Sequence, residues 1–334
     1  MTASIPSERS VLKDPSAQRE LRSRLLRWYD RHQRDLPWRR DRDPYRVWVS
    51  EIMLQQTRVV AVIEHYQKFL RHFPTITSLA AAREAQVLAA WSGLGYYRRA
   101  RMMYATAKKI VKEHESQFPA SAESLRALPG IGRYSSAAIA SIAFDEPIAV
   151  VDGNVGRVLG RLVGKELPGE QAWVAAEELL SRRRPGDFNQ AMMELGATVC
   201  LPKSPVCLLC PVSGLCATRG ELRGSKKGTQ RRKVVIHYEL NCRNGSVLLL
   251  QRPKRASVMS GMWELPEVPA ANASPKTWLM LRHSITVTDY DVRVQRGQGP
   301  APKSMVGEWI AKSRLTKLPL TGLARKILRA AKVI

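Results

Sequence analysis

Two acidic residues of this 334-residue sequence lie in apolar segments, where a carboxyl group could do chemistry. Asp43 and Pro44 are typical of the start of a helix, and that helix carries Glu51 within the nearly apolar stretch 47–54. Burial would raise the pKa of Glu51, and a carboxyl group that keeps its proton near neutral pH can act as a general acid. The pattern alone leaves open that Glu51 is solvated on an amphipathic helix.

Asp152 follows the apolar run 148–151 and precedes a segment whose apolar residues form one helical stripe. It could cap that helix, and it could also point into a site, since the two roles are compatible. Glycosidic bond cleavage uses one protonated carboxyl group for the leaving group and one ionised carboxylate for the oxocarbenium-like sugar. Glu51 and Asp152 could supply that pair.

Four of the five cysteines are close together, in the pattern Cys-x6-Cys-x2-Cys-x5-Cys. The first ten residues do not resemble a secretory signal, so we expect a reducing, cytoplasmic location, where cysteines more often bind metal than form disulfides. The spacing alone permits either a zinc ion or an iron-sulfur cluster. The four are Cys200, Cys207, Cys210 and Cys216; we expect the fifth, Cys242, to pack in a strand.

The sequence is strongly basic, with 54 Lys and Arg against 29 Asp and Glu and a net charge of +25. Such an excess favours a nucleic acid partner, although a solvated basic surface or an anionic membrane could also account for it. The length suits about two domains, and we expect a soluble protein because no apolar stretch is long enough to span a membrane.

The hydrophobic pattern changes once along the chain. From about Arg19 to Arg219 it is helical, and the segment 219–233 is a basic, glycine-containing linker. Alternation in 234–240, a tight hairpin turn at Asn244-Gly245 and a second strand at 247–250 then predict that a separate α+β domain begins here, with these two strands paired across the turn. Within the helical part, Gly130 and Gly132 separate two helices and could expose backbone N–H groups to an anion, although an ordinary turn is equally compatible.

These motifs resemble those of the MutY adenine DNA glycosylases in the endonuclease III superfamily. The resemblance is dense from about Leu21 to Cys216 and includes the family's cysteine spacing. It implies a mainly α region at 1–218, a basic linker at 219–233 and a smaller α+β, Nudix-like domain at 234–334. Within the first region it implies a helix-hairpin-helix glycosylase, with a six-helix module at about 35–145 and an iron-sulfur domain made of the N-terminal helix and 146–218. The matching segments are Leu36–Arg39, Ser50–Thr57, Trp91–Tyr97, Leu128–Arg133, Val151–Val155 and Asn189–Gly196.

The resemblance implies an enzyme of base excision repair that flips adenine mispaired with 8-oxoguanine or guanine and hydrolyses its glycosidic bond. Glu51 would protonate an adenine ring nitrogen, and Asp152 would stabilise or transiently trap the anomeric carbon. The implied cofactor is one [4Fe-4S] cluster on the four cysteines, and the implied partner is mismatched double-stranded DNA, bound by a monomer. Further residues are implied beside Asp152 (Tyr134, Asn154), at the adenine (Trp38, Arg39, Gln190), at the 8-oxoguanine (Gln56, Thr57, Leu94, Tyr96) and at a phosphate (Gly130, Gly132).

Tyr134 distinguishes the two most similar families. Endonuclease III relatives, which are glycosylase-lyases acting on oxidised pyrimidines, have a nucleophilic lysine after the hairpin's final Gly-Arg, whereas Tyr134 follows Gly132-Arg133 here. A phenol cannot form the Schiff base that β-elimination requires, so we predict a monofunctional enzyme. The alternatives are a pyrimidine-directed glycosylase-lyase and a non-catalytic iron-sulfur DNA-binding protein.

The C-terminal part resembles the Nudix-like domain of MutY at 247–253 and 261–266. The glutamates with which a Nudix hydrolase binds magnesium are missing after Glu267, so we expect recognition without hydrolysis. Family members often carry Phe-Ser-His in the loop that inspects 8-oxoguanine; here the sequence is Ile285-Thr286-Val287, which keeps only the hydroxyl of Thr286. We therefore predict weaker discrimination between 8-oxoguanine and guanine.

Overall fold

The computed structural model describes residues 11–222, 231–253, 255–256, 259–274, 277–285, 288–297 and 307–334. Contacts divide the chain into two compact units, Met1–Gln56 with Lys109–Lys226, and Thr57–Lys108 with Lys227–Ile334, and each is described by itself. The domain boundaries implied by the resemblance stay a prediction.

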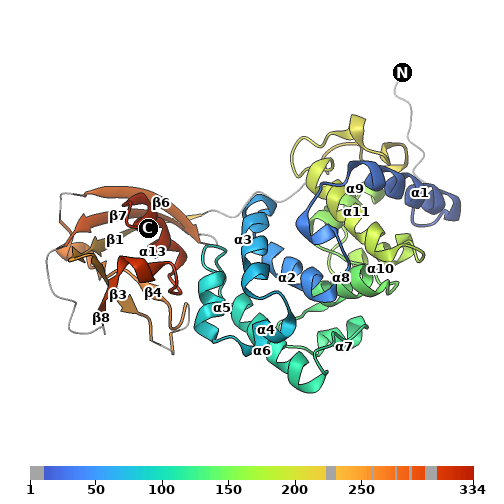
Figure 1. Ribbon diagram of the computed structural model, residues 1–334. Coiled ribbons are helices and arrows are strands. Elements are labelled where there is room, and N and C mark those ends of the chain that lie inside the picture. The colour runs from blue at the N-terminus through green and yellow to red at the C-terminus, as the bar shows by residue number, and fades with distance from the viewer. Residues whose placement is uncertain are drawn as a thin grey trace. The chain divides into compact units, whose positions relative to one another are not determined.

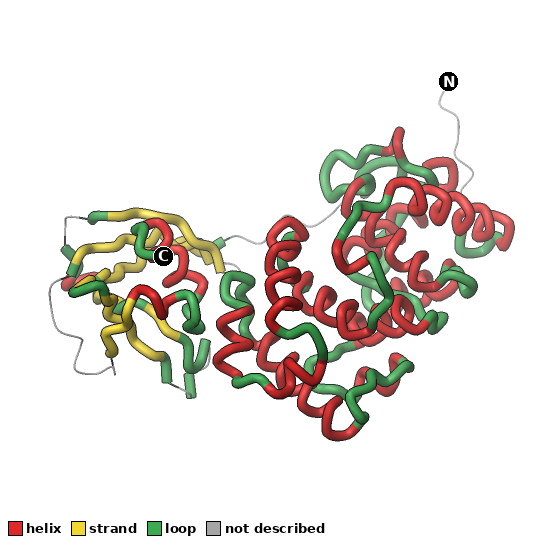
Figure 2. The backbone as a smooth tube through the Cα atoms, viewed as in Figure 1, coloured by secondary structure: helices red, strands yellow, loops and turns green. Residues whose placement is uncertain are grey.

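The first unit is helical in its described part (Figures 1 and 2), as the hydrophobic pattern predicts. Helix α6 contributes only its C-terminal end, since it begins in the second unit. The elements are α1 (Pro15–His32), η1 (Pro37–Arg39), α2 (Pro44–Leu54), α6 (Arg98–Glu113), α7 (Ala122–Arg126), α8 (Arg133–Phe144), α9 (Gly153–Val163), α10 (Glu170–Leu179), α11 (Pro185–Thr198), η2 (Cys207–Leu209) and η3 (Ser213–Leu215).

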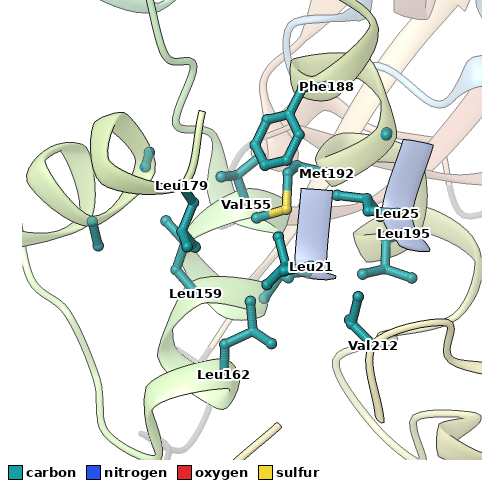
Figure 3. Packing of buried hydrophobic residues seen from close by; sticks show 14 of the residues in the cluster. Leu21, Leu25, Val155, Leu159, Leu162, Leu179, Phe188, Met192, Leu195 and Val212 are labelled. Atoms are coloured by element: carbon teal, nitrogen blue, oxygen red, sulfur yellow. The ribbon is translucent and has the colours of Figure 1, made fainter. Parts of the chain in front are cut away.

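A core of leucine, valine and other apolar side chains joins α1 to α9, α10 and α11 (Figure 3). Leu21, Leu25 and Leu159 in this core are completely buried. Val212, between the last two cysteines of the cluster, packs against the same core. The core therefore fixes helix α9, which begins just after Asp152, and the cysteine segment in one rigid body.

The second unit combines helices with two small sheets. Its helices are α3 (Val59–His72), α4 (Ile76–Ala81), α5 (Glu84–Ala90), most of α6, α12 (Lys312–Leu315) and α13 (Gly322–Ala330), with the short turn η4 (Ala270–Asn272). The first sheet has the order β5 (Glu267–Val268), β1 (Arg232–Leu240), β7 (Thr288–Arg296) and β6 (Leu279–Ile285). The second contains β2 (Cys242–Arg243), β3 (Ser246–Gln251), β4 (Trp263–Glu264) and β8 (Gly307–Ala311).

The strand prediction for 234–250 is confirmed in its local features and wrong in its pairing. Asn244 and Gly245 have φ values of 47° and 72° and form a tight turn, as predicted. That turn joins β2 to β3, whereas β1 lies in the other sheet and pairs in parallel with β7. The side chain of Cys242 is exposed, contrary to expectation, because β2 is a two-residue strand at the edge of its sheet.

Among the described residues, no helix is both long enough and apolar enough to cross a membrane.

Candidate active site and cysteine cluster

Glu51 is an acidic residue in the interior of the first unit, with 6% of its surface exposed. It lies on α2, which starts as predicted: Pro44 is in the first turn and the Asp43 carboxylate accepts a hydrogen bond from the Arg46 N–H at 2.9 Å. Burial raises the pKa of Glu51 to about 7. The Tyr134 hydroxyl and Arg39 oppose this rise and the charge of Asp152 adds to it, so all three groups lie within electrostatic reach of Glu51.

Asp152 is the N-cap of α9 and at the same time an electrostatic neighbour of Glu51, so both predicted roles are compatible with its position. Its Oδ1 accepts a hydrogen bond from the Val155 N–H at 2.7 Å, and its Oδ2 accepts one from the Asn154 Nδ2 at 3.2 Å. Both carboxylate oxygens are therefore oriented by α9, and Asn154 does lie beside Asp152 as expected.

Arg157 and Gly196 hold Asn154 in place. The Arg157 guanidinium donates to Asn154 Oδ1 at 2.9 Å, to the Gly196 carbonyl at 2.6 Å and to the Cys200 carbonyl at 2.9 Å. A Cβ at Gly196 would lie 2.7 Å from the Cβ of Asn154, so only glycine allows α11 to approach the start of α9 this closely. The Arg157 side chain thus connects Asn154, which supports Asp152, to the cysteine segment at Cys200.

Tyr134 lies in the first turn of α8, which packs against both α2 and α11. Its hydroxyl donates to the sulfur of Met193 on α11 at 3.3 Å. Burial, followed by the neighbouring Glu51 and Asp152 carboxylates, raises the pKa of Tyr134 well above its usual value. The phenol therefore stays protonated beside both acids.

The helix-hairpin-helix turn between α7 and α8 contains the two predicted glycines. Gly130 has a φ of 73°, which favours glycine, and Gly132 is the N-cap of α8 with a solvent-exposed, extended backbone. No atom lies within 4 Å of a Cβ built at Gly132. The first amides of α8 are thus approachable, as an anion site at a helix N-terminus would require.

Three residues implied to surround adenine lie on η1 and α11. Trp38 is buried, Arg39 is nearly buried, and Gln190 is half-buried. Gln190 precedes Glu194 by one helical turn, so the two share a face of α11. The Arg39 Nη2 donates to Glu194 Oε2 at 2.9 Å, which brings this face of α11 to η1.

Glu194 and Asn189 are positioning residues that the sequence analysis did not identify. Glu194 is 1% exposed; burial favours its neutral form, but hydrogen bonds from Arg34 and Arg39 prevail and lower its pKa to about 2. Asn189 donates to the Ile148 carbonyl at 2.9 Å and accepts from the Val150 N–H at 3.1 Å, which fixes the segment leading to Asp152. Their signal was present, since both are polar residues that alternate with the buried apolar residues of α11.

The four clustered cysteines line a single cavity together with Arg161, Val199, Pro205, Ser213, Arg219 and Gly220. Arg161 donates to Cys200 Sγ at 3.3 Å, and the Arg219 N–H donates to Cys216 Sγ at 3.4 Å. Burial and then, more weakly, the charges of the other three thiolates raise the pKa of Cys210 to about 11, against an opposing hydrogen bond with Val212. In the described part of the chain, no three cysteine, histidine or carboxylate side chains are arranged to hold a single metal ion.

The remaining predicted DNA contacts lie mostly in the second unit. The exposed Gln56 is the last residue of the first segment of the first unit, and the Thr57 hydroxyl accepts a hydrogen bond from Arg99 at 3.2 Å. Leu94 is buried, whereas Tyr96 is 43% exposed. Thr286 lies outside the described residues.

One segment of the chain matches a known protein family, and it contains most of this site. Residues 49–173, which include Glu51, the hairpin and Asp152, match the model of the HhH-GPD superfamily of base excision DNA repair proteins.

The relatives in three organisms are each named adenine DNA glycosylase. The human protein is 48% identical over 63% of this chain and 41% of its own length. The Buchnera aphidicola (Schizaphis graminum) protein is 39% identical over 64% of this chain and 63% of its own length. The Schizosaccharomyces pombe protein is 34% identical over 76% of this chain and 59% of its own length. The chain thus spans about half the length of the curated relatives it matches.

Two solved structures share the fold. A thermostable thymine-DNA glycosylase superposes with a TM-score of 0.57 and 28% identity, covering 60% of this chain and 96% of its own. A trapped endonuclease III–DNA covalent intermediate superposes with a TM-score of 0.53 and 20% identity, covering 60% of this chain and 94% of its own. Residues 49–173 of the chain therefore form a domain of the HhH-GPD superfamily of base excision DNA repair proteins, and the curated relatives to which the chain is similar are adenine DNA glycosylases.

Proposed function

We propose that this protein removes adenine mispaired with 8-oxoguanine or guanine from double-stranded DNA by hydrolysing the N-glycosidic bond. The observation that carries the proposal is Glu51, a buried carboxyl group with a pKa of about 7 that lies near Tyr134 and Asp152. The names of the relatives add the substrate, since they are adenine DNA glycosylases. The net charge of +25 suits a polyanionic partner.

In the proposed reaction the two acids have different roles. Glu51 Oε2 is buried without a hydrogen-bond partner in the described part of the structure, so a flipped adenine can take up its proton at a ring nitrogen. Protonation makes adenine a better leaving group. Asp152, held by the Val155 amide and by Asn154, faces the positive charge that develops on the sugar and stabilises it.

Tyr134 makes the proposed reaction monofunctional. A lysine at this position would attack the anomeric carbon and lead to strand cleavage by β-elimination, whereas a phenol forms no Schiff base. The Tyr134 hydroxyl instead contacts Glu51 and Met193. The product is then an abasic site in an intact strand.

We also propose that Cys200, Cys207, Cys210 and Cys216 hold one [4Fe-4S] cluster. Thiols around a shared cavity, with N–H groups directed at two sulfurs, fit a cluster of several metal atoms better than one tetrahedral zinc ion, whose four thiolates would each lie about 2.3 Å from the metal. When bound, the cluster would close the cysteine segment covalently. In the scheme above the catalytic steps are assigned to protein side chains, and the cluster has a structural role.

Incubation with a duplex containing adenine opposite 8-oxoguanine, followed by alkali, tests the function. Strand cleavage only after alkali is expected; cleavage without alkali would indicate a glycosylase-lyase, and no cleavage would indicate a DNA-binding protein. Glu51→Gln should abolish adenine release while mismatch binding persists. Glu113→Gln, which changes an exposed glutamate of α6, is the matched control and should retain activity. Full activity of Glu51→Gln would contradict the assignment of the general acid.

The C-terminal part of the chain is proposed to be a Nudix-like domain that recognises the base opposite adenine. It contains two small sheets and α13, which is an α+β composition, and Thr286 remains the proposed contact with 8-oxoguanine. Because Ile285-Thr286-Val287 lacks an aromatic ring and an imidazole, we expect a smaller preference for 8-oxoguanine over guanine than in relatives with Phe-Ser-His. Equal preferences in side-by-side single-turnover assays would contradict this.

A further inference from the structure

The loop 91–97, between α5 and α6, holds Tyr96 in an unusual conformation. Gly93, Gly95 and Tyr96 have φ values of 111°, 71° and 48°. The left-handed region is unfavourable for a tyrosine, so surrounding contacts must maintain it. The result is an aromatic ring that is 43% exposed next to Tyr97, which is only 4% exposed.

Arg99 supports the middle of this loop from inside. Its Nη2 donates to the carbonyls of Leu94 and Gly95 at 3.2 and 3.3 Å, and its guanidinium lies 5.5 Å from the centre of the Tyr96 ring. The Trp91 indole N–H also donates to the Gly95 carbonyl, at 3.0 Å. These bonds define the loop's shape, but they all arise from the loop itself and from the first turn of α6.

Both ends of the loop are attached to the start of α13, which belongs to the same compact unit. At one end the buried Ser92 hydroxyl donates to the Leu320 carbonyl at 3.0 Å and accepts from Arg325 Nε at 2.7 Å. At the other end the Tyr97 hydroxyl donates to the same carbonyl at 2.9 Å. Residues 92 and 97 therefore share one anchor, and the residues between them form a closed arch.

The anchor itself is rigid. The Thr321 N–H donates to the Trp263 carbonyl, and the Trp263 N–H donates to the Pro319 carbonyl, both at 2.9 Å, so the chain before α13 is tied to β4. The Thr321 hydroxyl caps α13 through the Ala324 N–H at 3.2 Å. Leu320 is completely buried. Movement of the anchor would thus require the C-terminal core to open.

We infer that α13 holds the loop 91–97 in the conformation that exposes Tyr96, and that Arg325 is a positioning residue for this ring. The inference rests on the proposed function, because an aromatic side chain presented in this way can stack where a flipped base leaves a gap. The C-terminal part of the chain would then influence the DNA duplex through the loop as well as through any direct contact of its own.

Arg325→Gln and Tyr97→Phe test this inference in the full-length protein. Tyr97→Phe removes one hydroxyl and keeps the ring, so the core stays packed. This variant therefore keeps the test possible even if Arg325→Gln does not fold. Hydrogen–deuterium exchange of the free protein should become about tenfold faster in a peptide covering 92–97, as expected when a hydrogen bond to a buried group is lost. The matched control is Arg329→Gln, which changes an exposed arginine one turn later on α13 and should leave exchange unchanged.

A second measurement tests the consequence for DNA. In single-turnover adenine release from a duplex with adenine opposite 8-oxoguanine, the half-saturating enzyme concentration should rise about tenfold, while the rate at saturation and its pH dependence stay those of the wild type. A merely destabilised enzyme would instead lose active fraction at every concentration.

Three outcomes are distinguishable. Faster exchange at 92–97 with weaker half-saturation supports the inference. The inference is overturned if exchange at 92–97 is unchanged in both folded variants. It is also overturned if exchange is faster but the half-saturating enzyme concentration stays that of the wild type. If the wild type releases no adenine, the proposed function fails, and the exchange measurement on the free protein alone decides whether α13 holds the loop.

Discussion

The buried Glu51 makes the stability of the protein depend on pH in a direction opposite to that of most carboxyl groups. Its pKa rises from 4.5 to about 7 because burial disfavours the ionised form. Between these values the native protein keeps a proton that the unfolded chain releases, so stability falls as the pH rises through this interval. Below pH 4.5 both states are protonated, and above about pH 7 both are ionised.

The magnitude follows from the difference of about 2.5 between the two pKa values. Each pKa unit corresponds to about 1.36 kcal/mol, so ionised Glu51 costs the native state about 3 kcal/mol relative to the protonated form. Glutamine has nearly the same shape and no charge. We therefore expect Glu51→Gln to become more stable, relative to the wild type, by about 3 kcal/mol as the pH is raised from about 5 to about 8.5.

The measurement is urea denaturation followed by tryptophan fluorescence at several pH values. The quantity of interest is the change with pH in the stability difference between Glu51→Gln and the wild type, which cancels the titration of all other groups. Glu113→Gln, on the exposed surface, serves as the control and should show a nearly flat difference. A flat difference for Glu51→Gln as well would show that Glu51 is solvated in the native protein, and the argument for its role as an acid would fail.

Four further outcomes are expected. The rate of adenine release, measured in single-turnover assays, should fall about tenfold per pH unit above about 7, because Glu51 loses its proton. A rate that rises steadily through this range would exclude a protonated acid. Glu194→Gln should destabilise the protein by about 3 kcal/mol above about pH 5, measured by urea denaturation, because two arginines lose their buried partner; since the pKa of Glu194 is lowered, its contribution disappears only as the pH falls toward 2. Gly196→Ala should displace Asn154, lower the free energy of unfolding by about 1–3 kcal/mol and slow adenine release in the same single-turnover assay. Wild-type release rates would show that α11 can shift without affecting the site. Arg161→Gln should reduce the iron bound per chain and the visible absorbance of the purified protein, and full iron content would show that the cysteines need no such support.

Local signals in the sequence predicted several features of the fold and of the site correctly. The helix start at Asp43-Pro44, the turn at Asn244-Gly245 and the cap at Asp152 each depend on neighbouring residues and their backbone preferences. The burial of Glu51 agrees with the nearly apolar stretch 47–54, but that pattern alone left a solvated position open.

Contacts between distant residues could not be predicted in this way. Arg39 and Glu194 are separated by 155 residues, and Ser92 and Arg325 by 233. Nothing in the local pattern of an arginine states which carboxylate or hydroxyl it will meet. The parallel pairing of β1 with β7 was missed for the same reason, since alternation predicts a strand but not its partner.

The sequence by itself determined which residues of this protein could do chemistry: two carboxyl groups in apolar segments, four clustered cysteines, and a tyrosine where a nucleophilic lysine would otherwise stand. Tertiary structure decided their environment. Packing of α2 against α8 buries Glu51 near Tyr134 and Asp152, and this burial, which no local pattern can supply, raises the pKa of Glu51 to about 7. Desolvation and the choice of partner depend on what the whole chain brings together, because the energy of a charge depends on all the groups around it.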